Sequence, residues 1–218
     1  MAVVPSLAVD AAGWRELLEQ WNADLFATPE IVEQLPEEVK HAGWLGAPPA
    51  TAEQIDQAEA RLGVALPPAY RAFLAVTNGW RCTGFGASPG PIWAVQDVDW
   101  YRVRHQDLID GWHLGERSQG PPEALPDDAY LVYGENQDST SLRSEYLDTA
   151  LQISEHERAG TAVYLLNPMV VTPEGEWEAW MFAHWLPGAR RYRSFWELMG
   201  GEYRMFLRVR QLMASRAV

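Results

Sequence analysis

The stretch of sequence that decides the fold runs from Thr51 to Trp80 and reads TAEQIDQAEARLGVALPPAYRAFLAVTNGW. It predicts two short helices joined by a glycine turn and a double proline. Thr51 and Gln54 have the spacing of a capping box, in which each side chain bonds a free backbone amide at the start of a helix. Gly63 stands where a left-handed residue would end that helix. Pro67-Pro68 then restarts the chain, because proline is tolerated in a first helical turn.

The two helices of this stretch each have one apolar face. The first is expected to bury Ile55, Ala58 and Leu62, and the second to bury Tyr70, Phe73, Leu74 and Thr77. Asn78-Gly79 gives the second helix a stop of its own, and Trp80 follows it. Every signal in the stretch is therefore a cap, a stop or a core contact. The stretch predicts a scaffold, and function is expected in the segments around it.

The composition is that of a globular protein with one domain, or one domain with an extension. With 218 residues the chain can bury a core without metals or disulfides. Its single cysteine, Cys82, has no internal partner, which suits a reducing cytosol. The N-terminus lacks the basic segment of a signal peptide, and no run reaches the roughly 20 apolar residues of a membrane span. We therefore expect a cytoplasmic protein that does not enter a membrane.

The net charge of −13 is unevenly distributed along the chain. Residues 1–48 hold two cations against eight carboxylates, and residues 81–184 hold six arginines against 17 carboxylates. Residues 185–218 hold seven arginines against two carboxylates. An acidic body with a basic C-terminal stretch argues against nucleic acid as the main partner. It fits a basic protein as partner, although acidity also serves solubility alone.

The N-terminal part of the chain predicts helices. Its first apolar stripe has helical spacing and consists of Trp14, Leu17, Leu18, Trp21 and Leu25. A second short helix is expected to begin at Thr28-Pro29 and to be interrupted by Pro36. We therefore divide the chain into an N-terminal helical extension, residues 1–43, and a main domain, residues 44–218. The stripe predicts packing onto the main domain, with a detached partner-binding helix as the alternative.

The period of the apolar pattern changes in the C-terminal half. Strands are expected at 129–133, 150–154, 161–166, 169–172 and 176–182. Pro173-Glu174-Gly175 is a hairpin signal between the last two. Asp97 is expected to cap a helix before these strands, and Ser194 to cap a closing helix that Gly200-Gly201 kinks or splits. Consecutive strands favour a mainly antiparallel sheet, so the predicted class is α+β.

The sequence contains no convincing catalytic or metal-binding motif. Its five histidines are not at metal-ligand spacing, Cys82 has no CxxC partner, and no serine lies in a GxSxG elbow. Gly84 and Gly86 lack the strand, helix and third glycine of a dinucleotide turn. A Cys-His nucleophile pair stays open, because its members meet in space. We expect no enzymatic activity, metal or cofactor.

The spacing within residues 51–80 closely resembles the hallmark of the SUKH superfamily. The residues that carry it are Ile55, Glu59, Leu62-Gly63, Leu66-Pro67, Tyr70, Phe73-Leu74 and Asn78-Gly79. The sequences around Trp44 and from Trp180 to Trp196 also look like bacterial members. The resemblance covers roughly residues 44–210. It implies a twisted antiparallel sheet with helices packed around it and no enzymatic activity.

The resemblance also implies a partner protein. The superfamily includes a yeast regulator of cell-wall glucan synthesis and many bacterial immunity proteins, which bind and block a cognate toxin domain, often a nuclease. We expect a cytoplasmic immunity protein that binds such a toxin through acidic loops. The candidate contact residues are Asp97, Asp99, Asp127, Asp128, Glu135 and Asp138.

Two other functions stay open from the sequence. The first is a regulatory scaffold for assembly of the cell wall or envelope, which is closer to the yeast role. The second is a small-molecule or enzymatic cleft lined by Trp80, Trp93 and Trp100, three of the eleven tryptophans. Tryptophan rings bury a large area and keep one donor, so they serve a core and a cleft wall equally.

Overall fold

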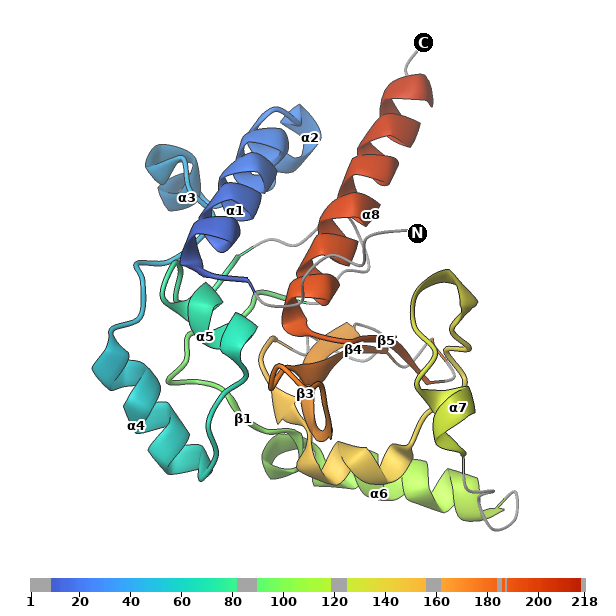
Figure 1. Cartoon of the computed structure of the whole chain (residues 1–218). Helices are drawn as coiled ribbons and strands as arrows, with labels where there is room; N and C mark the ends of the chain where they lie inside the picture. The colour runs from blue at the N-terminus through green and yellow to red at the C-terminus, as the bar shows by residue number, and fades with distance from the viewer. Residues whose placement is uncertain are drawn as a thin grey trace.

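The computed structural model describes residues 9–81, 90–118, 125–155, 162–183, 186 and 188–216. It confirms the expected α+β class, with a mainly antiparallel sheet and packed helices (Figure 1). The sheet has five strands in the order β1-β2-β3-β4-β5, so each strand pairs with its neighbours in sequence. Cys82 and the Gly84/Gly86 loop lie outside the described residues.

The sheet is short at one edge and long at its centre. Its strands are β1 (Asp99–Trp100), β2 (Leu151–Gln152), β3 (Ala162–Val171), β4 (Trp177–Ala183) and β5 (Ala189–Tyr192). β3 unites the two strands expected at 161–166 and 169–172, with a register shift between Asn167 and Val171. Gly175 ends the hairpin with a positive φ of 86°, as its sequence predicts.

Helices cover both faces of the sheet. One face, with Tyr164 and Leu166, joins a core with α1 (Ala11–Phe26), α4 (Ala52–Leu62), α5 (Pro68–Leu74) and α8 (Phe195–Arg216). The other face, with Val163 and Leu165, packs under α6 (Tyr101–Ser118) and the 3₁₀ helix η2 (Ser144–Thr149). Successive side chains point to opposite faces, so β4 is buried along its whole length.

The stretch from Thr51 to Trp80 folds as its signals predict. Thr51 Oγ1 accepts from Gln54 N at 3.2 Å, and Gln54 Oε1 accepts from Thr51 N at 2.9 Å, which completes the capping box of α4. Gly63 ends α4 with a φ of 73°. Glu59 then accepts from Leu66 N at 2.7 Å and pairs with Arg71, so it fixes the turn between α4 and α5. These residues build scaffold.

The N-terminus of α5 is capped from the sheet. Its N-cap residue is Pro67, whose side chain has no acceptor. The fully buried Glu176, directly before β4, accepts from Ala69 N at 2.8 Å instead. The acceptor is supplied by a residue 107 positions away, so the cap depends on tertiary structure.

The N-terminal helices share the main core with the rest of the chain. Trp14 and Trp21 of α1 are fully buried, and Trp14 Nε1 donates to Ala69 O of α5 at 2.8 Å. Asp24 near the end of α1 pairs with Arg210 of α8 at 2.8 Å. α2 (Pro29–Val32) and α3 (Glu37–Ala42) follow, separated at Pro36 as expected. Figure 1 shows α1 and α8 on the same side of the sheet.

The expected strand at 129–133 is wrong. Residues Asp127–Tyr130 form α7, a single helical turn. Pro126 stands at its N-cap, and Asp127 and Asp128 occupy its first turn, where carboxylates complement the helix dipole. Tyr130 is fully buried and its phenol donates to Glu178 of β4 at 2.8 Å. These contacts override the β propensity of the segment.

The expected split of the closing helix is wrong as well. α8 runs unbroken through Gly200-Gly201, with Ser194 Oγ accepting from Glu197 N at 3.2 Å at its start, as predicted. A Cβ at Gly201 would lie 2.8 Å from the Tyr192 ring, so this glycine permits close packing. The irregular residue is His105 in α6, with φ −134° and ψ 30°. Asp97 caps no helix: it lies in a turn before β1, and α6 begins at Tyr101.

Candidate partner-binding surface

The six carboxylates predicted to contact a partner fall into separate groups. Asp97 and Asp99 lie at the β1 edge of the sheet, where Asp99 is paired with Gln152. Glu135 and Asp138 lie beyond the opposite edge, because Gln137 bonds the Arg191 backbone of β5. Five strands separate these edges by about 19 Å at ordinary strand spacing. Asp127 and Asp128 lie on α7.

Three of the six carboxylates are held by neighbouring groups. Asp127 pairs with Arg143 at 2.5 Å, and Asp99 Oδ1 accepts from Trp100 N at 2.8 Å. Asp138 accepts from Thr140 Oγ1 at 2.7 Å and from Thr140 N at 2.9 Å, as its turn motif predicts. The hydroxyl of Thr140 is the main cause that holds the pKa of Asp138 below its ordinary value. Asp138 is therefore a turn-forming residue as well as an exposed charge.

The other three carboxylates are exposed. The side chains of Asp97, Asp128 and Glu135 make no ion pair within the described ranges. Their charge is therefore available to a partner.

α6 connects two of these groups, the one at 97–99 and the one on α7. It begins directly after β1 and, in Figure 1, runs along the lower side of the molecule toward α7. Sequence reasoning missed its outward carboxylates, Asp107 and Asp110, which with Leu114 recur at i, i+3 and i+7. The described residues between 97 and 148 include eleven carboxylates and four arginines. We call the surface made by 97–99, α6, α7 and η2 the acidic face.

Exposed apolar side chains stand among these charges. Val103 and Leu114 of α6 are 62% and 64% exposed, and Leu108 is 41% exposed. A cavity of about 290 Å³ lies beside Leu108 and is walled by Tyr101, Ile109, Trp112, Leu147 and Phe182. Exposed apolar groups rimmed by polar ones are typical of protein-binding surfaces. The helical spacing of these apolar residues in the sequence could have revealed this surface.

The three tryptophans of the cleft hypothesis have different environments. Trp80 is 1% exposed and packs in the main core against Trp21 and Trp44. Trp93 Nε1 donates to Glu155 at 2.9 Å, and Arg104 stacks over its ring. Trp100 packs against the main core. Trp80 therefore serves the core.

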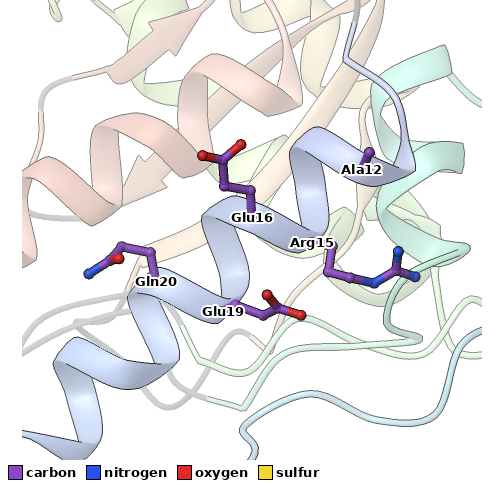
Figure 2. A pocket seen from close by; sticks show the side chains of 5 residues that line it. All are labelled: Ala12, Arg15, Glu16, Glu19 and Gln20. Carbon is purple, nitrogen blue, oxygen red and sulfur yellow. The ribbon is translucent and has the colours of Figure 1, made fainter.

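α1 carries a shallow hollow of about 440 Å³ on its outer side (Figure 2). Its lining residues are Ala12, Arg15, Glu16, Glu19 and Gln20, all from one helix. In Figure 2, Glu16 extends to one side of the ribbon, while Arg15 and Glu19 extend to the other. The polar groups do not converge, so this hollow has no geometry for holding a ligand.

In the part of the chain that the structure describes, no three His, Cys, Asp or Glu side chains are grouped so that they could hold a metal ion. Across the same residues, no helix combines the length and apolar character needed to cross a membrane.

Comparison with known protein families gives a match. The sequence model of the SMI1 / KNR4 family (SUKH-1) matches residues 49–201. The match starts just before the capping box of α4 and ends at Gly201 of α8, so α1, α2 and α3 lie outside it. No curated protein is similar enough to the chain to count as a match.

Proposed function

Because the chain belongs to the SMI1 / KNR4 family (SUKH-1), we propose that it is a cytoplasmic bacterial immunity protein that neutralises a cognate polymorphic toxin. Members of this family bind partner proteins and are generally not enzymes. In this proposal the protein acts by covering the active site of the toxin. That requires a surface complementary in shape and charge, and no catalytic group.

The acidic face is the observation that supports this proposal. A toxin that cleaves nucleic acid has a basic surface for phosphates, and clustered carboxylates would occupy that surface and speed the encounter. Val103, Leu108 and Leu114 supply apolar contact area among these carboxylates. An apolar centre with a charged rim is the usual anatomy of a protein interface. We propose that α6 forms the centre and that Asp97, Asp99 and α7 form the rim.

Co-expression with the toxin encoded beside this gene tests the proposal. The wild-type chain is expected to rescue growth. Reversal of Asp107 and Asp110 to Lys is expected to slow association about tenfold or more at low salt and to weaken rescue. The matched control is Glu16→Lys with Glu19→Lys on α1, which makes the same change of charge away from the acidic face and leaves rescue intact.

The apolar contacts have a separate readout. Replacing Val103 and Leu114 with Ser is expected to speed dissociation of the toxin complex, with little change in the association rate. Rescue that survives charge reversal of Asp107 and Asp110 and of all six predicted carboxylates would contradict binding through the acidic face.

The family equally includes regulators of cell-wall assembly, so a scaffold for envelope assembly is the alternative. Affinity capture from the native cell distinguishes the two. Recovery of wall-synthesis proteins without a toxin supports the scaffold, and recovery of a toxin domain supports immunity.

A further inference from the structure

A groove of opposite charge lies on the other side of the molecule, between α8, β5 and residues 131–139. It consists of two adjoining hollows of about 690 and 430 Å³, which share Gly134, Tyr192 and Arg204. Among the described residues, each hollow is lined by three arginines and one carboxylate. The larger hollow has Arg191, Arg193 and Arg204 against Glu197. The smaller has Arg190, Arg204 and Arg208 against Glu135.

A buried polar network lies behind the larger hollow. Glu178 and Arg191 are both almost fully buried, with Arg191 Nη1 3.7 Å from Glu178 Oε1. The carboxylate of Glu178 also accepts hydrogen bonds from four side chains, those of Tyr130, Tyr133, Asn167 and Trp180. Glu178 is thus fully supplied with donors, and its charge is satisfied.

Arg191 is not satisfied in the same way. Its Nη1 donates to Tyr130 O, and its guanidinium lies 4.1 Å from the centre of the Tyr130 ring. Its Nε and Nη2 are buried and have no hydrogen-bond partner within the described residues. Buried donors left without an acceptor are rare and destabilising, so each needs a physical reason. Because the Arg191 side chain is fully buried, these two donors do not open into the hollow.

Two of the arginines at the opening, Arg204 and Arg208, are available to an anion. Arg193 is paired with Glu197. Arg204 and Arg208 are exposed, and neither has an ion-pair partner in the described part of the chain. Arg204 lies in the lining of both hollows, so it stands where they join. Arg204 therefore presents an accessible guanidinium to both hollows.

Gly200 keeps this space open. It lies in the lining of the larger hollow, in the interior of α8, where glycine destabilises a helix by about 1 kcal/mol relative to alanine. A Cβ there would meet only the end of the flexible Arg204 side chain, at 3.3 Å. Packing therefore does not require this glycine, in contrast to Gly201. A ligand that occupies the hollow would require glycine at this position.

We propose that the groove binds a small organic anion. Its carboxylate or phosphate group would be held by Arg204, and its apolar body would lie against Tyr133, Trp196 and Tyr203. A volume of about 690 Å³ is in the range of small-molecule sites. Arginine suits either oxyanion because its donors form a planar fork. This inference does not depend on toxin binding.

Thermal shift and titration calorimetry of the full chain test the proposal. The probes are inorganic phosphate, adenosine monophosphate and 3-phenylpropionate. At least one is expected to raise the Tm in proportion to the logarithm of its concentration, with an affinity that falls as salt rises. Tighter binding of adenosine monophosphate assigns a phosphate ligand, and tighter binding of phenylpropionate assigns a carboxylate ligand.

Two variants locate the site. Arg204→Gln is expected to weaken binding at least tenfold, while Arg15→Gln, an exposed arginine on α1, binds like the wild type. Gly200→Leu fills the hollow and is expected to abolish binding without lowering the Tm of the free protein. Two results would overturn the proposal. The first is the absence of a Tm shift with every probe at about 10 mM, which would mean an affinity on the order of millimolar or weaker. The second is equal binding by the Arg204 and Arg15 variants.

Discussion

At the residue scale, buried ionisable groups make the sharpest predictions, and Glu176 is the first. Burial raises the pKa of Glu176 to about 7, from an ordinary 4.5, and its Oε2 has no partner among the described groups. A carboxyl whose pKa is raised on folding stabilises the fold while it is protonated. That stability is fully present below pH 4.5 and is lost as pH rises toward 7.

Glu176→Gln is therefore expected to remove a pH dependence of about 3 kcal/mol, because each pKa unit is worth about 1.36 kcal/mol. The amide of Gln keeps an acceptor for Ala69 N. Urea unfolding at pH 4.5 and at pH 8 measures this pH dependence of the unfolding free energy. The variant should gain stability relative to the wild type at the higher pH. Parallel stability curves for the two proteins would contradict the raised pKa.

Arg191 gives a second residue-scale prediction. Arg191→Met leaves the buried Glu178 without its cation, so we expect a loss of about 3–5 kcal/mol of unfolding free energy. Replacing Glu178 with Gln in the same chain should restore part of that loss, because the uncompensated buried charge is gone. Denaturant unfolding of the two variants and of the double variant measures the coupling. Additive losses would contradict a direct interaction between the pair.

Sequence reasoning found residues with local roles and missed those with distant partners. The Thr51–Gln54 box was predictable because both members lie within one turn. Glu176 and Glu178 look like surface carboxylates of an acidic chain, since their partners are 107 and up to 48 positions away. For the same reason the candidate contacts were found as separate carboxylates, and their arrangement around α6 was not.

At the element scale, the paired glycines of α8 show what a pattern leaves undecided. Two adjacent glycines in a helix predict a kink or a break, and here they have two different roles within one continuous helix. Gly201 admits the Tyr192 ring, and Gly200 lines the hollow. Segment 127–130 gives the complementary case. The apolar run 129–133 predicts a strand, but a proline cap and two N-terminal carboxylates make 127–130 a helical turn. Neither outcome follows from period alone.

The two glycines make a matched pair of variants. Gly200→Ala is expected to stabilise the protein by up to about 1 kcal/mol, because alanine favours helix and only the mobile Arg204 end lies near. Gly201→Ala is expected to destabilise it, because the new methyl group would lie 2.8 Å from the Tyr192 ring. Thermal unfolding compares them directly. Equal effects of the two substitutions would contradict the packing assigned to Gly201.

At the scale of the whole molecule, one core crosses the predicted boundary between residues 1–43 and 44–218. Trp14, Leu18, Trp21 and Leu25 of α1 are fully buried in the same cluster as α5 and α8. We therefore expect a chain that lacks residues 1–43 to lose cooperative unfolding, and Trp14→Ala to destabilise the full chain by about 3–5 kcal/mol. Circular dichroism during thermal unfolding measures both. A truncated chain that unfolds cooperatively at the wild-type Tm would contradict a shared core.

The cap on α5 has a consequence for the order in which the protein assembles on the ribosome. The two motif helices are synthesised about 100 residues before Glu176, which corresponds to roughly 5–20 s of translation. During that interval α5 has neither its cap nor the sheet beneath it. The helices that identify the family are therefore synthesised early, but α5 receives its cap and its packing against the sheet late. A nascent chain that stalls before β4 would expose the apolar face of α5 to chaperones and proteases.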